Sequence, residues 1–110
     1  MERRRAITQY DVFWITLDPT EGSEIAKTRP CVVISPDELN KYLRTVIVAP
    51  VTSTLKAYPF RINCMISGKE GSIALDQIRT VDKLRIGGYL GQLSVPESNA
   101  VKDILREMLC

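Results

Sequence analysis

Histidine is absent from this 110-residue sequence. Its absence excludes catalytic triads and dyads that depend on an imidazole, histidine metal ligands, and nucleases that act through a pair of histidines. The three cysteines, Cys31, Cys64 and Cys110, are odd in number and form no CxxC pair. This pattern argues against a disulfide framework and against a cysteine-based zinc site. We therefore expect reduced thiols, and chemistry that is carried by other side chains.

Long apolar runs are also missing. No stretch of about 18 apolar residues occurs, so we expect no membrane span, and the N-terminal ERRRAI lacks the apolar segment of a signal peptide. The acidic residues have no metal-ligand spacing, and the glycines form neither a Walker nor a Rossmann pattern. A net charge of +2 is too small for a protein that coats RNA electrostatically. We expect one cytoplasmic domain over residues 1–110, with no cofactor and no metal.

The sequence does contain a series of short apolar and β-branched segments separated by turn residues. This pattern predicts strands. We expect them at residues 11–17, 30–35, 45–51, 60–66, 72–78 and 87–93. The segments 18–29 and 52–59 are predicted to be loops, and GKEG at 68–71 a hairpin turn. Trp14 lies between apolar neighbours and is expected in the core.

Two segments have helical features. Residues 36–42 (PDELNKY) can form one helical turn with proline near its start. Ser94 and Glu97 make a capping box before a C-terminal segment. Apolar residues recur there at helical spacing: Val101, Ile104, Leu105, Met108 and Leu109. The predicted fold class is mainly β with helices (α+β), a small β-barrel whose closure removes sheet edges, with a C-terminal amphipathic helix.

Arg29 is the first candidate for chemistry, because it lies where a predicted loop meets a strand. Its planar guanidinium matches a phosphate bidentately. A surface ion pair with Glu24 or Glu21 would explain it equally well, since exposed pairs are common. The residues alone leave both interpretations open.

Other polar residues follow or interrupt predicted strands. The hydroxyls of Thr52 and Ser53 can donate to a phosphoryl oxygen or can simply cap a turn. Gln77, beside Asp76, offers a donor and an acceptor to a base edge, although both residues can equally face solvent. Tyr58 can stack on a base or close the rim of the barrel.

In these regions the sequence resembles the MazF/PemK/Kid toxin family. The shared blocks are DVFWITLDPTEGSE, KTRPCVVISP, VIVAPVTS, YPF and LDQIRTVDKLR, in this order from about Asp11 to Arg85, and GGYLGQLSVPE extends the likeness. The resemblance implies an SH3-like barrel, a homodimer, and a sequence-specific, metal-independent endoribonuclease. Such an enzyme cuts single-stranded mRNA to 2′,3′-cyclic phosphate and 5′-OH ends and thereby inhibits translation and growth.

The resemblance also implies a partner and a set of site residues. The partner is a cognate antitoxin with an acidic, partly disordered tail that folds on binding. Catalysis would fall on Arg29, Thr52 and Glu24, and RNA contacts on Ser53, Tyr58, Asp76 and Gln77.

The chain departs from some family members at two positions. Those members carry a histidine just before the position of Glu24 and an arginine two before that of Asp76. Here these positions hold Ser23 and Ala74, which favours the Arg–Thr version of the site.

Two rival functions share the predicted barrel. A gyrase poison of the CcdB type uses a tryptophan near its C-terminus, whereas the only tryptophan here is Trp14. A non-catalytic SH3-like module would bind nucleic acid or peptide without cleaving it and would be indifferent to Arg29. A degenerate toxin that serves as a co-repressor with its antitoxin is a third possibility.

Overall fold

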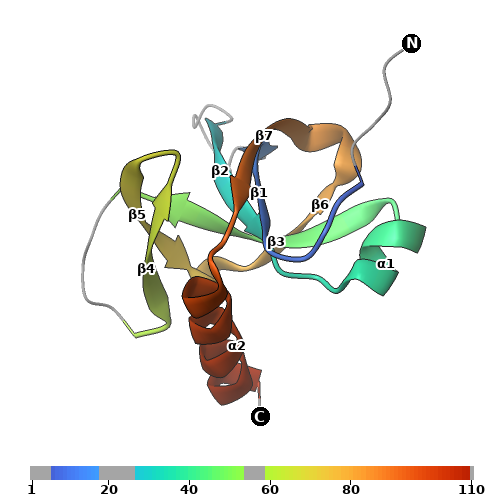
Figure 1. Ribbon diagram of the computed structural model, residues 1–110. Coiled ribbons are helices and arrows are strands. Elements are labelled where there is room, and N and C mark those ends of the chain that lie inside the picture. Colours follow the sequence, from blue (N-terminus) through green and yellow to red (C-terminus); the bar gives the residue numbers. More distant parts are fainter. Residues whose placement is uncertain (1–5, 18–26, 54–58, 110) are drawn as a thin grey trace, which may run out of the picture.

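The computed structural model describes residues 6–17, 27–53 and 59–109. Its strands are β1 (Asp11–Leu17), β2 (Lys27–Val33), β3 (Thr45–Thr52), β4 (Arg61–Ile66), β5 (Lys69–Ala74), β6 (Arg79–Asp82) and β7 (Ile86–Gln92) (Figure 1). Its helices are α1 (Asp37–Tyr42) and α2 (Val95–Leu109), with 3-10 turns η1 (Leu75–Gln77) and η2 (Lys83–Arg85). No helix in these ranges is long and apolar enough to cross a membrane.

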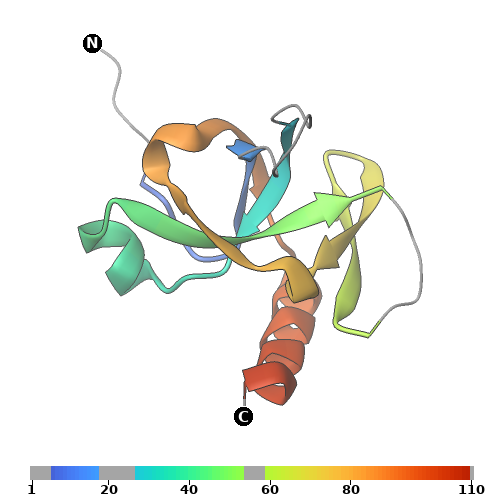
Figure 2. The ribbon, with the colours of Figure 1, turned by 180° about the vertical axis from the view of Figure 1, so that it is seen from behind.

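The strands form one curled antiparallel sheet in the order β4-β5-β3-β2-β1-β7. The N-terminal half of β3 also pairs with β6, and the sheet bends along this strand (Figures 1 and 2). The described ladder pairs leave β4 and β7 at the two ends of the path rather than joining them. Ser67 Oγ bridges these ends by donating to the Leu90 carbonyl at 3.3 Å. The predicted α+β fold class is confirmed as a half-barrel with a C-terminal helix.

Four predicted strands, 11–17, 45–51, 60–66 and 87–93, match β1, β3, β4 and β7 to within one residue. Strand β2 begins three residues before the predicted strand at 30–35, because residues 27–29 continue the pairing with β1. It also ends two residues before the predicted end, at Val33. The loop prediction for 18–29 is therefore wrong at residues 27–29, which lie in β2. Its other residues, 18–26, lie outside the described ranges. In the second predicted loop, Thr52 ends β3, and residues 54–58 lie outside the description.

The predicted GKEG hairpin turn is wrong by two residues. The turn is made by Ser67 and Gly68, whose φ angles are +50° and +79°, and Ile66 pairs with Lys69 across it. Two successive residues with positive φ are the mark of a type I′ turn, which matches the twist of a hairpin. Lys69, Glu70 and Gly71 belong to β5 instead.

The predicted strand at 72–78 is also wrong beyond Ala74. The chain leaves the sheet there and forms η1, so Asp76 and Gln77 lie in a 3-10 turn and not in a strand. The four-residue strand β6 follows, and it is too short for its alternation to be recognised in the sequence.

Helix α2 covers one of two apolar clusters in the sheet. Val101 is fully buried, and Ile104, Leu105 and Met108 pack against the same cluster. The predicted amphipathic helix is therefore confirmed, except that Leu109 is 74% exposed. The second cluster, on the other face of the sheet, includes Phe13, Ile15, Cys31, Val46 and Val48.

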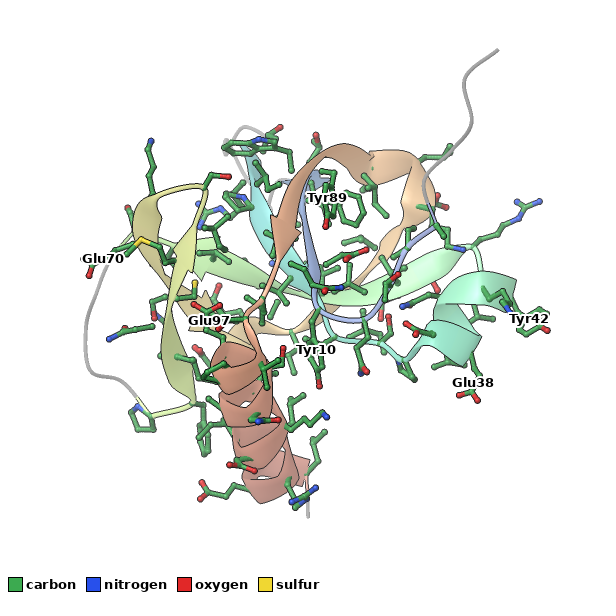
Figure 3. All side chains as sticks on the ribbon, in the orientation of Figure 1. Tyr10, Glu38, Tyr42, Glu70, Tyr89 and Glu97 are labelled. Carbon is green, nitrogen blue, oxygen red and sulfur yellow. The ribbon has the colours of Figure 1, made fainter. Side chains whose placement is uncertain are left out.

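The start of α2 is anchored by Glu97. Its Oε1 accepts from Ser94 N at 2.9 Å, and its own N–H donates to Ser94 Oγ at 3.2 Å, which is the predicted capping box. Its Oε2 accepts from Met65 N at 3.0 Å on the end strand β4. Figure 3 shows Glu97 at the top of α2 beside this strand. One carboxylate thus accepts hydrogen bonds from a backbone N–H at the start of the helix and from one on the open edge of the sheet.

A buried polar group connects α1 to the sheet. Ser35 Oγ lies 2.5 Å from Asn40 Oδ1, and Asn40 Nδ2 donates to the Ser35 carbonyl at 2.8 Å. Ser35 Oγ also accepts from Ile47 N at 3.1 Å. Both side chains are almost fully buried and satisfied, as buried polar groups require.

The anchoring role of Glu97 predicts that Glu97→Ala destabilises the fold by about 1–2 kcal/mol, because a cap bond and an edge-strand bond are lost together. Urea unfolding monitored by circular dichroism measures this value. Asp103→Ala, which removes an exposed acid from the same helix, should change the unfolding free energy by no more than about 0.5 kcal/mol. Equal effects of the two substitutions would contradict the role.

Candidate active site

A cleft of about 410 Å³ opens where β2 and β3 separate. The ladder between these strands ends at the pair Cys31–Pro50, and their ends point apart beyond it (Figure 1). The cleft is lined by Trp14, Arg29, Pro30, Val51, Thr52, Ser53, Ile66, Ser67, Lys69, Glu70, Gly71 and Leu90. It is bounded by β1, β2, β3, the β4–β5 hairpin and β7.

Arg29 and Thr52 both line this cleft, one from β2 and the other from β3. The β2–β3 register pairs Cys31 with Pro50, and the next positions on the same face along that register are Arg29 and Thr52. Both side chains are half-buried. A fixed cation and a hydroxyl donor thus line the same cleft, an arrangement suited to binding a phosphate group.

Ser53 and the β4–β5 hairpin form the outer rim. Ser53 is exposed directly after β3, and Lys69 and Glu70 line the cleft from the start of β5. Figure 3 shows Glu70 on this hairpin. The hairpin residues were not identified from the sequence, because nothing in a two-residue turn indicates which side of a barrel it will reach.

The prediction that Trp14 lies in the core is wrong. Its side chain is 41% exposed and lines the cleft, opposite Pro30 in the β1–β2 register. A Cβ on Gly87 would lie 3.1 Å from the Trp14 carbonyl oxygen, and a Cβ on Gly88 would lie 3.8 Å from Trp14 Cδ1. The absence of a side chain at these two glycines therefore lets β7 lie close to the backbone and the indole ring of Trp14. Alternation along β1, with Phe13 buried beside it, is the signal that could have revealed this.

Asp76 and Gln77 are separated from the cleft. They follow the C-terminal end of β5, whereas the cleft is lined by the N-terminal end of β5, which begins at Lys69. Neither residue lines the cleft. Arg61 Nε and Nη2 donate to the Asp76 carboxylate at 2.8 and 3.1 Å. The hydrogen bond from Arg61 lowers the pKa of this exposed carboxyl. The structure thus brings Arg29, Thr52 and Ser53 together, whereas Glu24 and Tyr58 lie outside the described residues.

The two described cysteines are unsuited to nucleophilic chemistry. Burial raises the pKa of Cys31 to about 12, against a smaller opposing effect of Arg29 and Arg79. Burial and then Glu97 raise the pKa of Cys64 to about 11. Both thiols are therefore protonated at neutral pH. In the described ranges, no group of three or more His, Cys, Asp or Glu side chains is placed to hold a metal ion.

Comparison with known proteins shows one consistent likeness. A family model described as PemK-like, MazF-like toxin of type II toxin-antitoxin system matches residues 8–109. The endoribonuclease toxin MazF of Escherichia coli (strain K12) is 38% identical over 73 residues, which cover 64% of this chain and 64% of that protein. The chain thus matches slightly less than two thirds of the length of this curated relative.

Solved structures share the same architecture. A crystal structure of MazF from Deinococcus radiodurans has a TM-score of 0.81 at 26% identity, covering 96% of this chain and 98% of that one. An endoribonuclease in complex with its cognate antitoxin from Mycobacterial species has a TM-score of 0.78, covering 94% and 95%. At its 22% identity, the second likeness concerns the fold alone.

Proposed function

This chain belongs to the PemK-like, MazF-like toxin family of type II toxin-antitoxin systems, and from that membership we propose that it is an endoribonuclease that cleaves single-stranded RNA without a metal ion. The observation that carries the proposal is that Arg29 and Thr52 line the same cleft, from β2 and β3. The E. coli relative, an endoribonuclease toxin by name, supports the same reaction.

The proposed reaction is an in-line attack of a ribose 2′-OH on the adjacent phosphate. The P–O bond to the 5′ oxygen breaks, which leaves a 2′,3′-cyclic phosphate and a 5′-OH. Because the nucleophile belongs to the substrate, no metal ion is needed to generate it. The protein must align the two oxygens and stabilise the charge that develops on the phosphorane. Arg29 neutralises this charge, and the Thr52 hydroxyl donates to a non-bridging oxygen.

Two proton transfers accompany this step: the 2′-OH gives its proton to a general base, and the departing 5′ oxygen takes up a proton from the protonated base or from water. A guanidinium has a pKa above about 12, so Arg29 is a weak general base near neutral pH. Glu24, outside the described residues, is the alternative acceptor of the 2′-OH proton if burial raises its pKa. We propose that Arg29 is essential, that Thr52 supports it, and that the base is one of Arg29 and Glu24.

The RNA contacts divide into two groups. Ser53 adjoins Thr52 at the cleft, so it contacts the nucleotide at the cleavage point, with Tyr58 near it in sequence. Trp14 is partly exposed and lines the same cleft, and stacking on an indole ring suits any base. Asp76 and Gln77 lie beyond the far end of β5, so they contact RNA at a distance from the scissile phosphate.

We further propose a homodimer and an antitoxin partner. A groove across two subunits would bring a second set of RNA contacts into line with the first. The antitoxin is supported by the family description. Its acidic tail would place carboxylates near Arg29 and Lys69, because a guanidinium binds carboxylate and phosphate with the same geometry.

The first prediction concerns cleavage of a long, sequence-diverse RNA by the purified protein in excess EDTA. Discrete cuts with cyclic phosphate ends are expected, as measured by end-mapping. Arg29→Ala should lower kcat by about 10²–10³-fold, the usual cost of removing one donor to a developing oxyanion. Arg106→Ala, which removes an exposed cation from α2, should cleave normally. An inert wild-type protein would favour the gyrase or binding-module alternatives instead.

The second prediction uses the only tryptophan of the chain as a probe. Binding of an uncleaved oligoribonucleotide to Arg29→Ala protein should change Trp14 fluorescence in a saturable way. In the wild-type chain, Trp14→Ala should raise KM by about 5- to 150-fold, since a stacked base contributes about 1–3 kcal/mol. Tyr42→Ala, which removes an exposed ring from α1 (Figure 3), should leave KM unchanged. Tight binding with unaltered fluorescence would contradict stacking on Trp14.

The third prediction concerns the oligomeric state. Multi-angle light scattering at micromolar concentration should give twice the 12.4 kDa mass of one chain. A single-chain mass under conditions in which the protein cleaves RNA would exclude the shared groove.

A further inference from the structure

Ser72 is a buried residue whose hydroxyl is unsatisfied. It lies in β5 with none of its surface exposed, and no hydrogen-bond partner for its Oγ is found among the described residues. A buried hydroxyl without a partner costs free energy, because it loses its hydrogen bonds to water without replacement. Ser35, the other buried serine of the described ranges, has the opposite environment: its Oγ contacts both Asn40 and Ile47.

The position of Ser72 relates it to the proposed active site. In the β3–β5 ladder, Ser72 is the direct partner of Thr52. Directly opposed residues share a face of the sheet, with Cβ atoms about 4.5–5.5 Å apart. On the other edge of β3, the ladder with β2 has ended at Cys31–Pro50, and Arg29 lies two residues beyond it at the cleft. Thr52 and Ser72 are therefore neighbours in one row of the sheet, and Arg29 lines the cleft beside Thr52.

The same sheet shows that opposed hydroxyls can reach each other. Thr16 and Thr28 are direct partners in the β1–β2 ladder, and their Oγ1 atoms lie 3.0 Å apart. Rotation of χ1 to another staggered position is the movement by which Ser72 Oγ would approach Thr52 Oγ1 in the same way.

Side-chain size does not explain the serine. The neighbouring Gly71 is tightly packed, since a Cβ there would lie 2.6 Å from Val51 Cγ1. That crowding lies on the opposite face of β5, because successive side chains of a strand point to opposite sides, so it does not restrict the size of residue 72. Ser72 is fully buried, and alanine would fill nearly the same space without burying a polar atom, so the hydroxyl itself requires an explanation.

We propose that Ser72 is a positioning residue that acts through Thr52. When RNA occupies the cleft, the Ser72 hydroxyl donates to Thr52 Oγ1. A threonine hydroxyl has two acceptor sites and one proton, so this bond leaves the Thr52 proton directed at the phosphoryl oxygen. The inference rests on the proposed function and adds to it a residue that never touches the substrate.

The test compares the two buried serines. Ser72→Ala should lower kcat by about 2- to 10-fold, the effect of one neutral hydrogen bond. It should leave KM unchanged, and Tm should stay the same or rise because an unsatisfied polar atom is removed. Ser35→Ala should instead lower Tm, because the bonds of Ser35 Oγ to Asn40 and Ile47 are lost. It should leave kcat unchanged at temperatures below the unfolding transition. A Ser72→Ala protein with wild-type kcat, or with a loss explained by a lower Tm, would overturn the proposal.

A double-mutant cycle shows whether Ser72 acts through Thr52. In a Thr52→Val background, Ser72→Ala should cause no further loss of kcat, because the hydroxyl that it positions is gone. Independent, multiplicative losses would overturn the proposed route. If Thr52→Val alone leaves kcat unchanged while Arg29→Ala shows its expected loss of kcat, the proposed role of Ser72 is overturned and the proposed nuclease activity is retained. A wild-type protein that cuts no RNA would overturn both the proposed nuclease activity and the proposed role of Ser72.

Discussion

The pairing demands of β3 determine the shape of this molecule. Its backbone must be satisfied on both edges along eight residues, and no single neighbour does so. One edge pairs with β2 over Cys31–Val33, while the other pairs first with β6 and then with β5. At Thr52, β3 no longer pairs with β2 but still pairs with β5. The gap between β2 and β3 is the cleft, so the candidate site follows from where one ladder stops.

The sequence predicted those elements whose burial is one-sided. β4 alternates and α2 repeats with a clear period, because in each element one face is covered and the other is exposed to solvent. Arg29 and Thr52 were identified for a related reason, since polar residues at the end of an apolar strand are visible without knowing the fold. β3 was found by its apolar run alone, because nearly all of it is buried.

The errors have identifiable physical causes. Gly71 was interpreted as a turn residue, but its lack of a Cβ serves close packing against Val51, and the turn uses Gly68. Trp14 was assigned to the core by residue type, although its position in the alternation of β1 places it in the cleft. The distance of Asp76 and Gln77 from the cleft depends on where β5 ends. That end depends on tertiary pairing and has no local signal in the sequence.

Polar groups in the described parts of this chain fall into two kinds, and the difference separates stability from function. Ser35, Asn40 and Glu97 make several hydrogen bonds each and connect elements that are distant in sequence. Ser72 is as buried as Ser35 and Asn40, lies beside Thr52 in the ladder, and has no such bonds among the described residues. A fold selected for stability alone would have an apolar atom at that position. A polar atom kept at a cost beside a proposed catalytic hydroxyl is expected where a site is organised for a charge that arrives with its substrate.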